Sequence, residues 1–194
     1  MKRTYFLQIL FILTSFIAFT AQSQELDYAK SRDYWMVDEN QNPVISKVFN
    51  LPPNATKSDI YEVVMDLVSK NYAASNFKIL YADSTKGKFI VNANYQLIFS
   101  TMSVWHTIAV ESRSDKVKVS FTLTSFEKPY YFRPDYFSKT EFLPIATEYP
   151  INQDKFKKRS QEQAFLAAVQ KSLDLLGNFE RTLTKVVTAK NADW

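Results

Sequence analysis

Residues that could support catalysis or bind a metal are scarce in this chain. His106 is its only histidine, and the sequence contains no cysteine and two glycines. Transition-metal sites draw mainly on histidine and cysteine ligands, and phosphate-binding loops need several glycines at fixed spacing. The sequence therefore predicts no bound metal and no cofactor.

His106 itself shares strand parity with Val104, Ile108 and Val110, which favours a buried, hydrogen-bonded core histidine. The alternative is a general base, which would need a nucleophile or an orienting acid beside it. A carboxylate pair assembled from distant segments, such as Glu111 with Glu127, is a second catalytic alternative. We predict that the protein is not an enzyme, with a hydrolase as the alternative.

The tripeptide Asp83-Ser84-Thr85 lies before Lys86-Gly87, where a turn is expected. It resembles a short O-glycosylation motif that some bacteria use on exported proteins, which makes Ser84 a candidate modification site. The other interpretation is an ordinary turn begun by an aspartate.

The segment at residues 129–144, PYYFRPDYFSKTEFLP, is the most unusual stretch of the chain because six of its sixteen residues are aromatic and no helix or strand period fits it. In one interpretation this loop folds back and its rings supplement the core, which a chain without disulfides could use. In the other, several rings face water as a recognition patch, since tyrosine suits binding surfaces. The candidate interaction surface comprises Tyr130, Tyr131, Phe132, Arg133, Tyr136, Phe137 and Phe142.

The N-terminus predicts export. Lys2 and Arg3 precede the apolar stretch YFLQILFILTSFIAFT, and small residues follow it, as in a signal peptide cleaved after Ser23. The alternative is a retained anchor, for which the stretch is short. Because no cysteine follows it, the protein is not a lipoprotein, and we expect it in the periplasm or outside the cell. Residues 24–43 read as a polar tether whose apolar cluster, Tyr34-Trp35-Met36, docks onto the domain.

Regular elements begin after Pro43. Residues 44–49 predict a strand, and Thr56 with Asp59 fits a capping box at the start of a helix over residues 57–72. The apolar residues of that helix recur at steps of three and four, which places them on one face. They are Ile60, Val63, Val64, Leu67 and Val68.

Four strands in quick succession, over about 77–81, 89–99, 104–110 and 117–123, predict antiparallel hairpins. We expect Phe77, Ile79 and Tyr81 to share one face, and the apolar alternation from Phe89 to continue to Phe99. The opposite face should be polar. Its residues are Asn92, Asn94, Gln96, Thr107, Glu111, Lys118, Ser120, Thr122 and Thr124.

A second, long helix is expected from about Ser160 to Val187, with Gly177 as a point where it could kink or break. A sheet with one polar face needs helical cover on a single side. The sequence thus predicts an α+β fold. The elements would follow one another along the chain in the order β-α-β-β-β-β-α. The strands, about five in number, would form a curved antiparallel sheet with both helices on one face.

The segment VISKVFNLPPNATKSDIYEVVMDLVSKNY with the hairpin FKILYADSTKGKFIVNANYQLIF resembles a bacterial domain of unknown function with a TBP-like (TATA-binding-protein-like) fold. The likeness covers about residues 44–125. It implies that fold, in a single repeat, and an exported protein, and it implies no catalytic or binding residues. We expect one domain over residues 44–190, with residues 128–158 as an insertion before the last helix.

Composition narrows the functional classes further. Without Lys2 and Arg3 the formal charge falls from +4 to +2, and a nearly neutral exported chain is poorly suited to binding nucleic acid, which depends on neutralising phosphates. The leading hypothesis is an interaction or accessory domain of the cell envelope that binds a protein, a glycan or a membrane surface through residues 130–142. The alternative is a carrier that holds a small apolar ligand between the sheet and the long helix.

Overall fold

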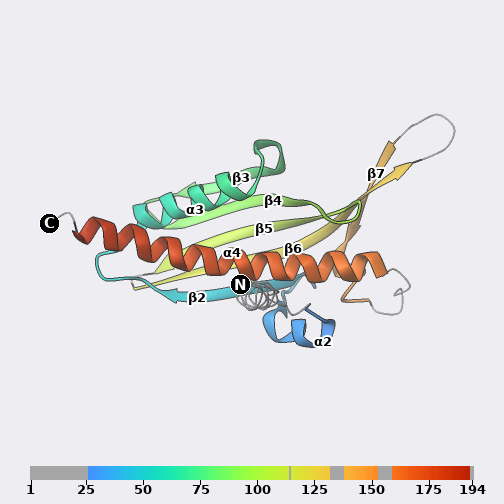
Figure 1. Cartoon of the computed structure of the whole chain (residues 1–194), viewed down its shortest axis with the longest axis horizontal. Helices are drawn as coiled ribbons and strands as arrows, with labels where there is room; N and C mark the ends of the chain where they lie inside the picture. The colour runs from blue at the N-terminus through green and yellow to red at the C-terminus, as the bar shows by residue number, and fades with distance from the viewer. Residues whose placement is uncertain (1–25, 114, 132–137, 153–158, 193–194) are drawn as a thin grey trace, which may run out of the picture.

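The computed structural model describes residues 26–113, 115–131, 138–152 and 159–192 (Figure 1). Its α-helices are α2 (Tyr28–Ser31), α3 (Lys57–Asn71) and α4 (Arg159–Ala192). Its strands are β1 (Met36–Val37), β2 (Pro43–Asn50), β3 (Phe77–Asp83), β4 (Lys88–Phe99), β5 (Met102–Arg113), β6 (Lys116–Tyr131) and β7 (Ser138–Pro144).

The strands form one antiparallel sheet in the order β1-β2-β6-β5-β4-β3. The sixteen-residue strand β6 organises it. Along one edge β6 pairs with β5, and along the other it pairs first with β2, over Lys116–Thr122, and then with β7, over Ser125–Tyr131. The predicted α+β fold with a curved antiparallel sheet is confirmed, although the sheet has seven strands in the described residues rather than about five.

Both long helices cover the same face of the sheet (Figure 1). Helix α4 crosses it obliquely, contacting β2, β4, β5 and β6, and α3 lies beside α4. Large apolar side chains fill the layer between helices and sheet. Among those fully buried are Phe121 and Phe126 of β6 and Phe165 and Phe179 of α4.

Helix α3 begins at the predicted capping box. The Thr56 hydroxyl accepts a hydrogen bond from the Asp59 amide at 3.2 Å, and the Asp59 carboxylate accepts one from the Thr56 amide at 2.8 Å. This arrangement satisfies amides that have no partner inside the helix. Helix α4 runs through Gly177 as one element, without the break that this glycine could have introduced.

Two irregularities change the predicted faces of β3 and β4. In β3 a bulge lies at Leu80, because Ile79 pairs with Val91 while Tyr81 pairs with Ile90. One extra residue moves every following side chain to the other face. The prediction that Phe77, Ile79 and Tyr81 share a face was therefore wrong.

In β4 the expected alternation stops after Tyr95, where the register with β5 shifts. Leu97 adopts a φ of 45° and is 65% exposed, while Ile98 packs against the core. Positive φ is rare for residues other than glycine. It departs from strand geometry, so side chains beyond this point no longer alternate between the two faces of the sheet. The alternation predicted to Phe99 therefore ends four residues early.

The segment expected as a tether folds onto the domain from Leu26 onward. The Trp35 ring is buried and packs edge-on against Phe165 of α4, with ring centroids 5.4 Å apart. β1 then pairs with the start of β2. Residues 1–25, which include the predicted signal peptide, lie outside the described residues. None of the described helices is both long and apolar enough to cross a membrane.

The aromatic segment is largely a hairpin rather than the expected loop. β6 continues to Tyr131 and pairs with β7, so that Phe142 lies opposite Glu127. Pairing with β5 ends at Glu127. Pro129 therefore lies where β6 has a neighbour on only one side, a position that tolerates a residue without an amide proton. The sequence pattern missed these strands because prolines and adjacent aromatics hide the two-residue period.

Candidate functional site

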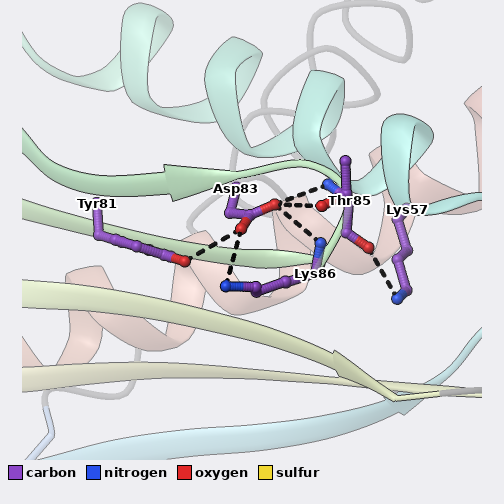
Figure 2. A network of polar contacts seen from close by, with 5 residues as sticks. All are labelled: Lys57, Tyr81, Asp83, Thr85 and Lys86. Atoms are coloured by element: carbon purple, nitrogen blue, oxygen red, sulfur yellow. Dashed lines mark hydrogen bonds and ion pairs between the residues drawn. The ribbon is translucent and has the colours of Figure 1, made fainter.

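The β3–β4 turn holds the most connected polar group among the described residues (Figure 2). The Asp83 carboxylate accepts hydrogen bonds from the Thr85 hydroxyl at 2.7 Å and from the amides of Thr85 and Lys86, each at 3.0 Å. Its second oxygen accepts from the Tyr81 hydroxyl at 3.1 Å and lies 3.5 Å from the Lys86 ammonium. The Thr85 hydroxyl bond and then the Lys86 amide hold the pKa of Asp83 well below its usual range.

Two further contacts attach this turn to the body of the protein. The Lys57 ammonium, at the start of α3, donates to the Thr85 carbonyl at 3.0 Å. The Ser112 amide of β5 donates to the Gly87 carbonyl at 2.8 Å. Gly87 has a φ of +63°, and a Cβ there would lie 1.8 Å from the Ser112 hydroxyl oxygen. The turn is therefore held from both sides and needs glycine at this position.

These contacts account for Asp83 as a structural residue. An ionised carboxylate whose two oxygens both hold donors is a poor proton acceptor, so Asp83 is not a catalytic base in this arrangement. Ser84 is exposed at the turn, and its hydroxyl forms no hydrogen bond to the described part of the chain. An ordinary turn begun by an aspartate accounts for the presence of Asp83. The exposed Ser84 stays a candidate modification site.

The predicted interaction surface is divided by the structure. The backbones of Tyr130 and Tyr131 pair with Lys139 and Ser138 at the end of the β6–β7 hairpin. Phe142 lies in β7 and is 57% exposed. The remaining members of the surface lie outside the described residues. These are Phe132, Arg133, Tyr136 and Phe137.

Other rings from the insertion point inward. Tyr149 is buried, packs against Phe165 with ring centroids 5.2 Å apart, and lies 5.6 Å from Tyr28. Ile145, just after β7, is also fully buried. The C-terminal part of the insertion therefore supplements the core, whereas Phe142 on the hairpin faces water.

His106 is a core residue. It is fully buried, its ring stacks on Tyr95 with centroids 3.8 Å apart, and its Nε2 lies 2.8 Å from the Tyr72 hydroxyl. Its Nδ1 lies 3.4 Å from the Val104 carbonyl, so the neutral ring donates from Nδ1 and accepts from Tyr72 at Nε2. Burial lowers the pKa of His106 to about 3. Without access to solvent, this ring cannot serve as the base of a hydrolase.

The carboxylates are also poorly placed for catalysis. Glu127 pairs with Ser103 at one end of the β5–β6 ladder, and Glu111 pairs with Lys118 near the other end. Eight residues of β5 separate these pairs, which corresponds to about 26 Å at 3.3 Å per residue. The suggested pairing of Glu111 with Glu127 was therefore wrong. The described residues contain no group of three acids or histidines that could hold a metal ion.

The carrier alternative needs a cavity between the sheet and the long helix, α4. The hollow between α3 and the sheet, lined by Ile60, Val64, Phe89 and Val110, has a volume of about 10 Å³. That is room for about one water molecule, and far less than the several hundred Å³ that ligand sites occupy. The hollow fits no apolar ligand, and it lies beside α3 and the β3–β4 turn rather than under α4.

One polar cluster on the outer face was missed by the sequence reasoning. A single oxygen of Glu127 accepts hydrogen bonds from the Asn94 side-chain amide, at 3.0 Å, and from the Trp105 indole N–H. Asn94 was expected on this face, but it is 7% exposed because the cluster covers it. The sequence did contain one indication of the cluster. Trp105 lies two residues before the polar Thr107 in β5, so its indole belongs to the same, outer face.

Comparison with known proteins agrees with this fold. Residues 46–127 match the family described as a domain of unknown function (DUF4468) with TBP-like fold. The resemblance predicted from the sequence is thereby confirmed, and the family description supplies no activity. The chain matches no curated protein.

Two crystal structures of bacterial proteins have folds similar to that of this chain. A TBP-like protein from Parabacteroides distasonis is 13% identical, with a TM-score of 0.55 over 77% of this chain and 96% of that one. A DUF4468 family protein from Bacteroides ovatus is 16% identical, with a TM-score of 0.54 over 77% of this chain and 90% of that one. At this level of identity the likeness establishes the fold alone.

Proposed function

We propose that this protein is exported and acts as a non-enzymatic interaction domain that binds another protein of the cell envelope through the β6–β7 hairpin. The observation that carries the proposal is the position of the hairpin. It projects from the body, away from both helices (Figure 1), and it holds the 57% exposed ring of Phe142.

Several features support a protein partner over a glycan or a membrane surface. Within the described residues β7 pairs with β6 alone, so its other edge has backbone groups available to a strand from a partner. An exposed aromatic ring beside such an edge is a common anchor of protein interfaces. His106 is enclosed in the core, which supports a binding role over catalysis.

Photo-crosslinking in the cells that make the protein tests this proposal. A benzophenone side chain at Phe142 should give one discrete protein adduct. The same group at Val48, which is 56% exposed on β2 and distant from the hairpin, is the matched control and should give none. The purified partner should then bind Phe142→Ala at least tenfold more weakly than the unsubstituted protein.

The competing partners give different results. An adduct with phospholipid, or flotation of the protein with vesicles of anionic lipid, would assign the hairpin to a membrane surface. Retention on a polysaccharide matrix that depends on Phe142 would assign it to a glycan. Equal crosslinking at Phe142 and Val48 would remove the hairpin from the interaction.

A further inference from the structure

The cluster of Asn94, Trp105 and Glu127, here called the Glu127 cluster, lies at the root of the β6–β7 hairpin. It is on the face of the sheet opposite α3 and α4, which no helix of the described residues covers (Figure 1). Its members come from β4, β5 and β6, three neighbouring strands. Phe142 of β7 stands directly opposite Glu127, and directly opposed side chains in an antiparallel pair are near neighbours. A carboxylate is thus held between an indole and a phenyl ring.

The hydrogen bonds inside the Glu127 cluster are incomplete. Both donors, the Asn94 amide and the Trp105 indole, bind the same carboxylate oxygen. In the described part of the chain the other oxygen of Glu127 accepts no hydrogen bond, and Glu127 forms no salt bridge. The Asn94 carbonyl oxygen is buried without a partner there. Buried polar atoms of this kind are uncommon and costly.

The unused atoms define the chemistry of a ligand. Both are acceptors, while the Trp105 indole N–H and one of the two N–H groups of the Asn94 amide already donate to Glu127. Lysine and arginine side chains carry several donors and no acceptor, so they complement two unused acceptors better than a sugar hydroxyl, which brings one donor together with an acceptor. A cation is further favoured by the negative charge of Glu127 and by the face of an aromatic ring.

We propose that the Glu127 cluster binds a lysine or arginine side chain of a protein partner. The inference rests on the proposed function, which it deepens by naming one group that the partner of the hairpin contributes. Glu127 and the Trp105 ring contact the cation, and Asn94 acts as a positioning residue that holds the carboxylate.

Nuclear magnetic resonance of the exported protein tests this directly, with the Trp105 indole N–H as the reporter. The chain has three tryptophans, and the Trp105→Phe variant assigns the signal. The probes are the tripeptides Gly-Arg-Gly and Gly-Lys-Gly, each acetylated and amidated. The control is the same peptide with citrulline, the uncharged analogue of arginine. We expect a saturable shift with a dissociation constant on the order of 1 mM for the cationic peptides, and at least tenfold weaker binding of the citrulline peptide.

A charge-matched pair of variants locates the binding site. Glu127→Gln should weaken the cationic peptide at least tenfold. Glu111→Gln, on the same face but paired with Lys88 at 3.2 Å near the far end of the ladder, should leave its binding unchanged. If Glu127→Gln fails to fold, the comparison of arginine with citrulline on the unsubstituted protein still decides the question.

The proposal is overturned if the Trp105 signal shifts equally with the arginine and citrulline peptides, or with neither of them. A shift caused instead by a neutral oligosaccharide would make the cluster a sugar site. Because crosslinking at Phe142 and titration of Trp105 are separate measurements, the interaction through the hairpin and the cation site can fail independently.

Discussion

His106 and its partners explain how a buried polar residue is tolerated in this core. The ring nitrogens meet the Tyr72 hydroxyl and the Val104 carbonyl, and Tyr95 lies flat against the ring while its own hydroxyl lies 3.0 Å from that of Ser172 on α4. These bonds suit the neutral imidazole. Protonation would place a charge where the described neighbours offer aromatic rings and a single carbonyl.

This arrangement predicts that the folded protein loses stability as the pH falls, beginning at a pH above that at which ordinary carboxylates become protonated. The pKa of His106 is about 3 in the folded protein, against about 6.5 in the unfolded chain. The unfolded chain therefore binds more protons within this window, and stability falls as the pH drops through it. Between pH 7 and pH 5 the free energy of unfolding should decrease by about 2 kcal/mol.

Urea denaturation of the unsubstituted protein and of His106→Gln at both pH values measures this effect. The variant keeps an acceptor for the Tyr72 hydroxyl. Whatever its absolute stability, its free energy of unfolding should differ much less between pH 7 and pH 5 than that of the unsubstituted protein. An equal difference in the two proteins would assign the acid sensitivity to other groups.

Ser84 gives a second prediction at the scale of one residue. If Ser84 is glycosylated after export, the protein isolated from its native cells should be heavier than its bare chain, and the excess mass should disappear in Ser84→Ala. Thr85→Val is the informative control, because the Thr85 hydroxyl already donates to Asp83 and its loss should leave the glycan in place. An intact mass equal to that of the bare chain would show an ordinary turn.

The elements of this fold could be predicted to different extents from the sequence. Helices α3 and α4 and the central strands follow from apolar periods of 3.6 and 2, which the described structure retains. The faces of Tyr81 and Leu97 could not be predicted, because each follows a register shift that only cross-strand pairing reveals. The Glu127 cluster was missed for a similar reason. Its three members meet through the pairing of β4, β5 and β6 and share no local motif.

The two glycines of the chain occupy opposite kinds of element, and their substitution should have opposite effects. Gly87 closes the β3–β4 turn at positive φ against Ser112, whereas Gly177 lies in α4 with nothing within 4 Å of an added Cβ. Gly87→Ala should lower the free energy of unfolding by at least about 1 kcal/mol. Gly177→Ala should raise it by up to about 1 kcal/mol through helix propensity.

Thermal unfolding followed by circular dichroism compares the two glycine variants under identical conditions. The geometry indicates that a methyl group fits at position 177. A loss of stability in Gly177→Ala would contradict this. Unchanged stability in Gly87→Ala would mean that the turn can relax away from Ser112.

At the scale of the whole molecule, Trp35 is the buried side chain through which the N-terminal segment packs against Phe165 of α4. Trp35 contacts Phe165 and its indole N–H lies 3.4 Å from the Ser31 hydroxyl, while the adjacent Met36 is 69% exposed. Trp35→Ala should cost about 3–5 kcal/mol, and Met36→Ala less than about 0.5 kcal/mol.

Denaturant titration provides the two values, and limited proteolysis shows where the loss occurs. Cleavage in Trp35→Ala should appear first between Leu26 and Asn42, ahead of any cut in the sheet. Early cleavage at the same sites in Met36→Ala would indicate that the segment is held by β1 rather than by the tryptophan.

The length of β6, which spans Lys116–Tyr131, has a mechanical consequence. The strand that forms one side of the hairpin is the same strand that β2 and β5 flank deeper in the sheet. A pull applied at the hairpin along β6 would load many interstrand hydrogen bonds together, in shear, instead of opening them one after another. The domain should therefore resist a large force applied by a partner bound at the hairpin before it unfolds.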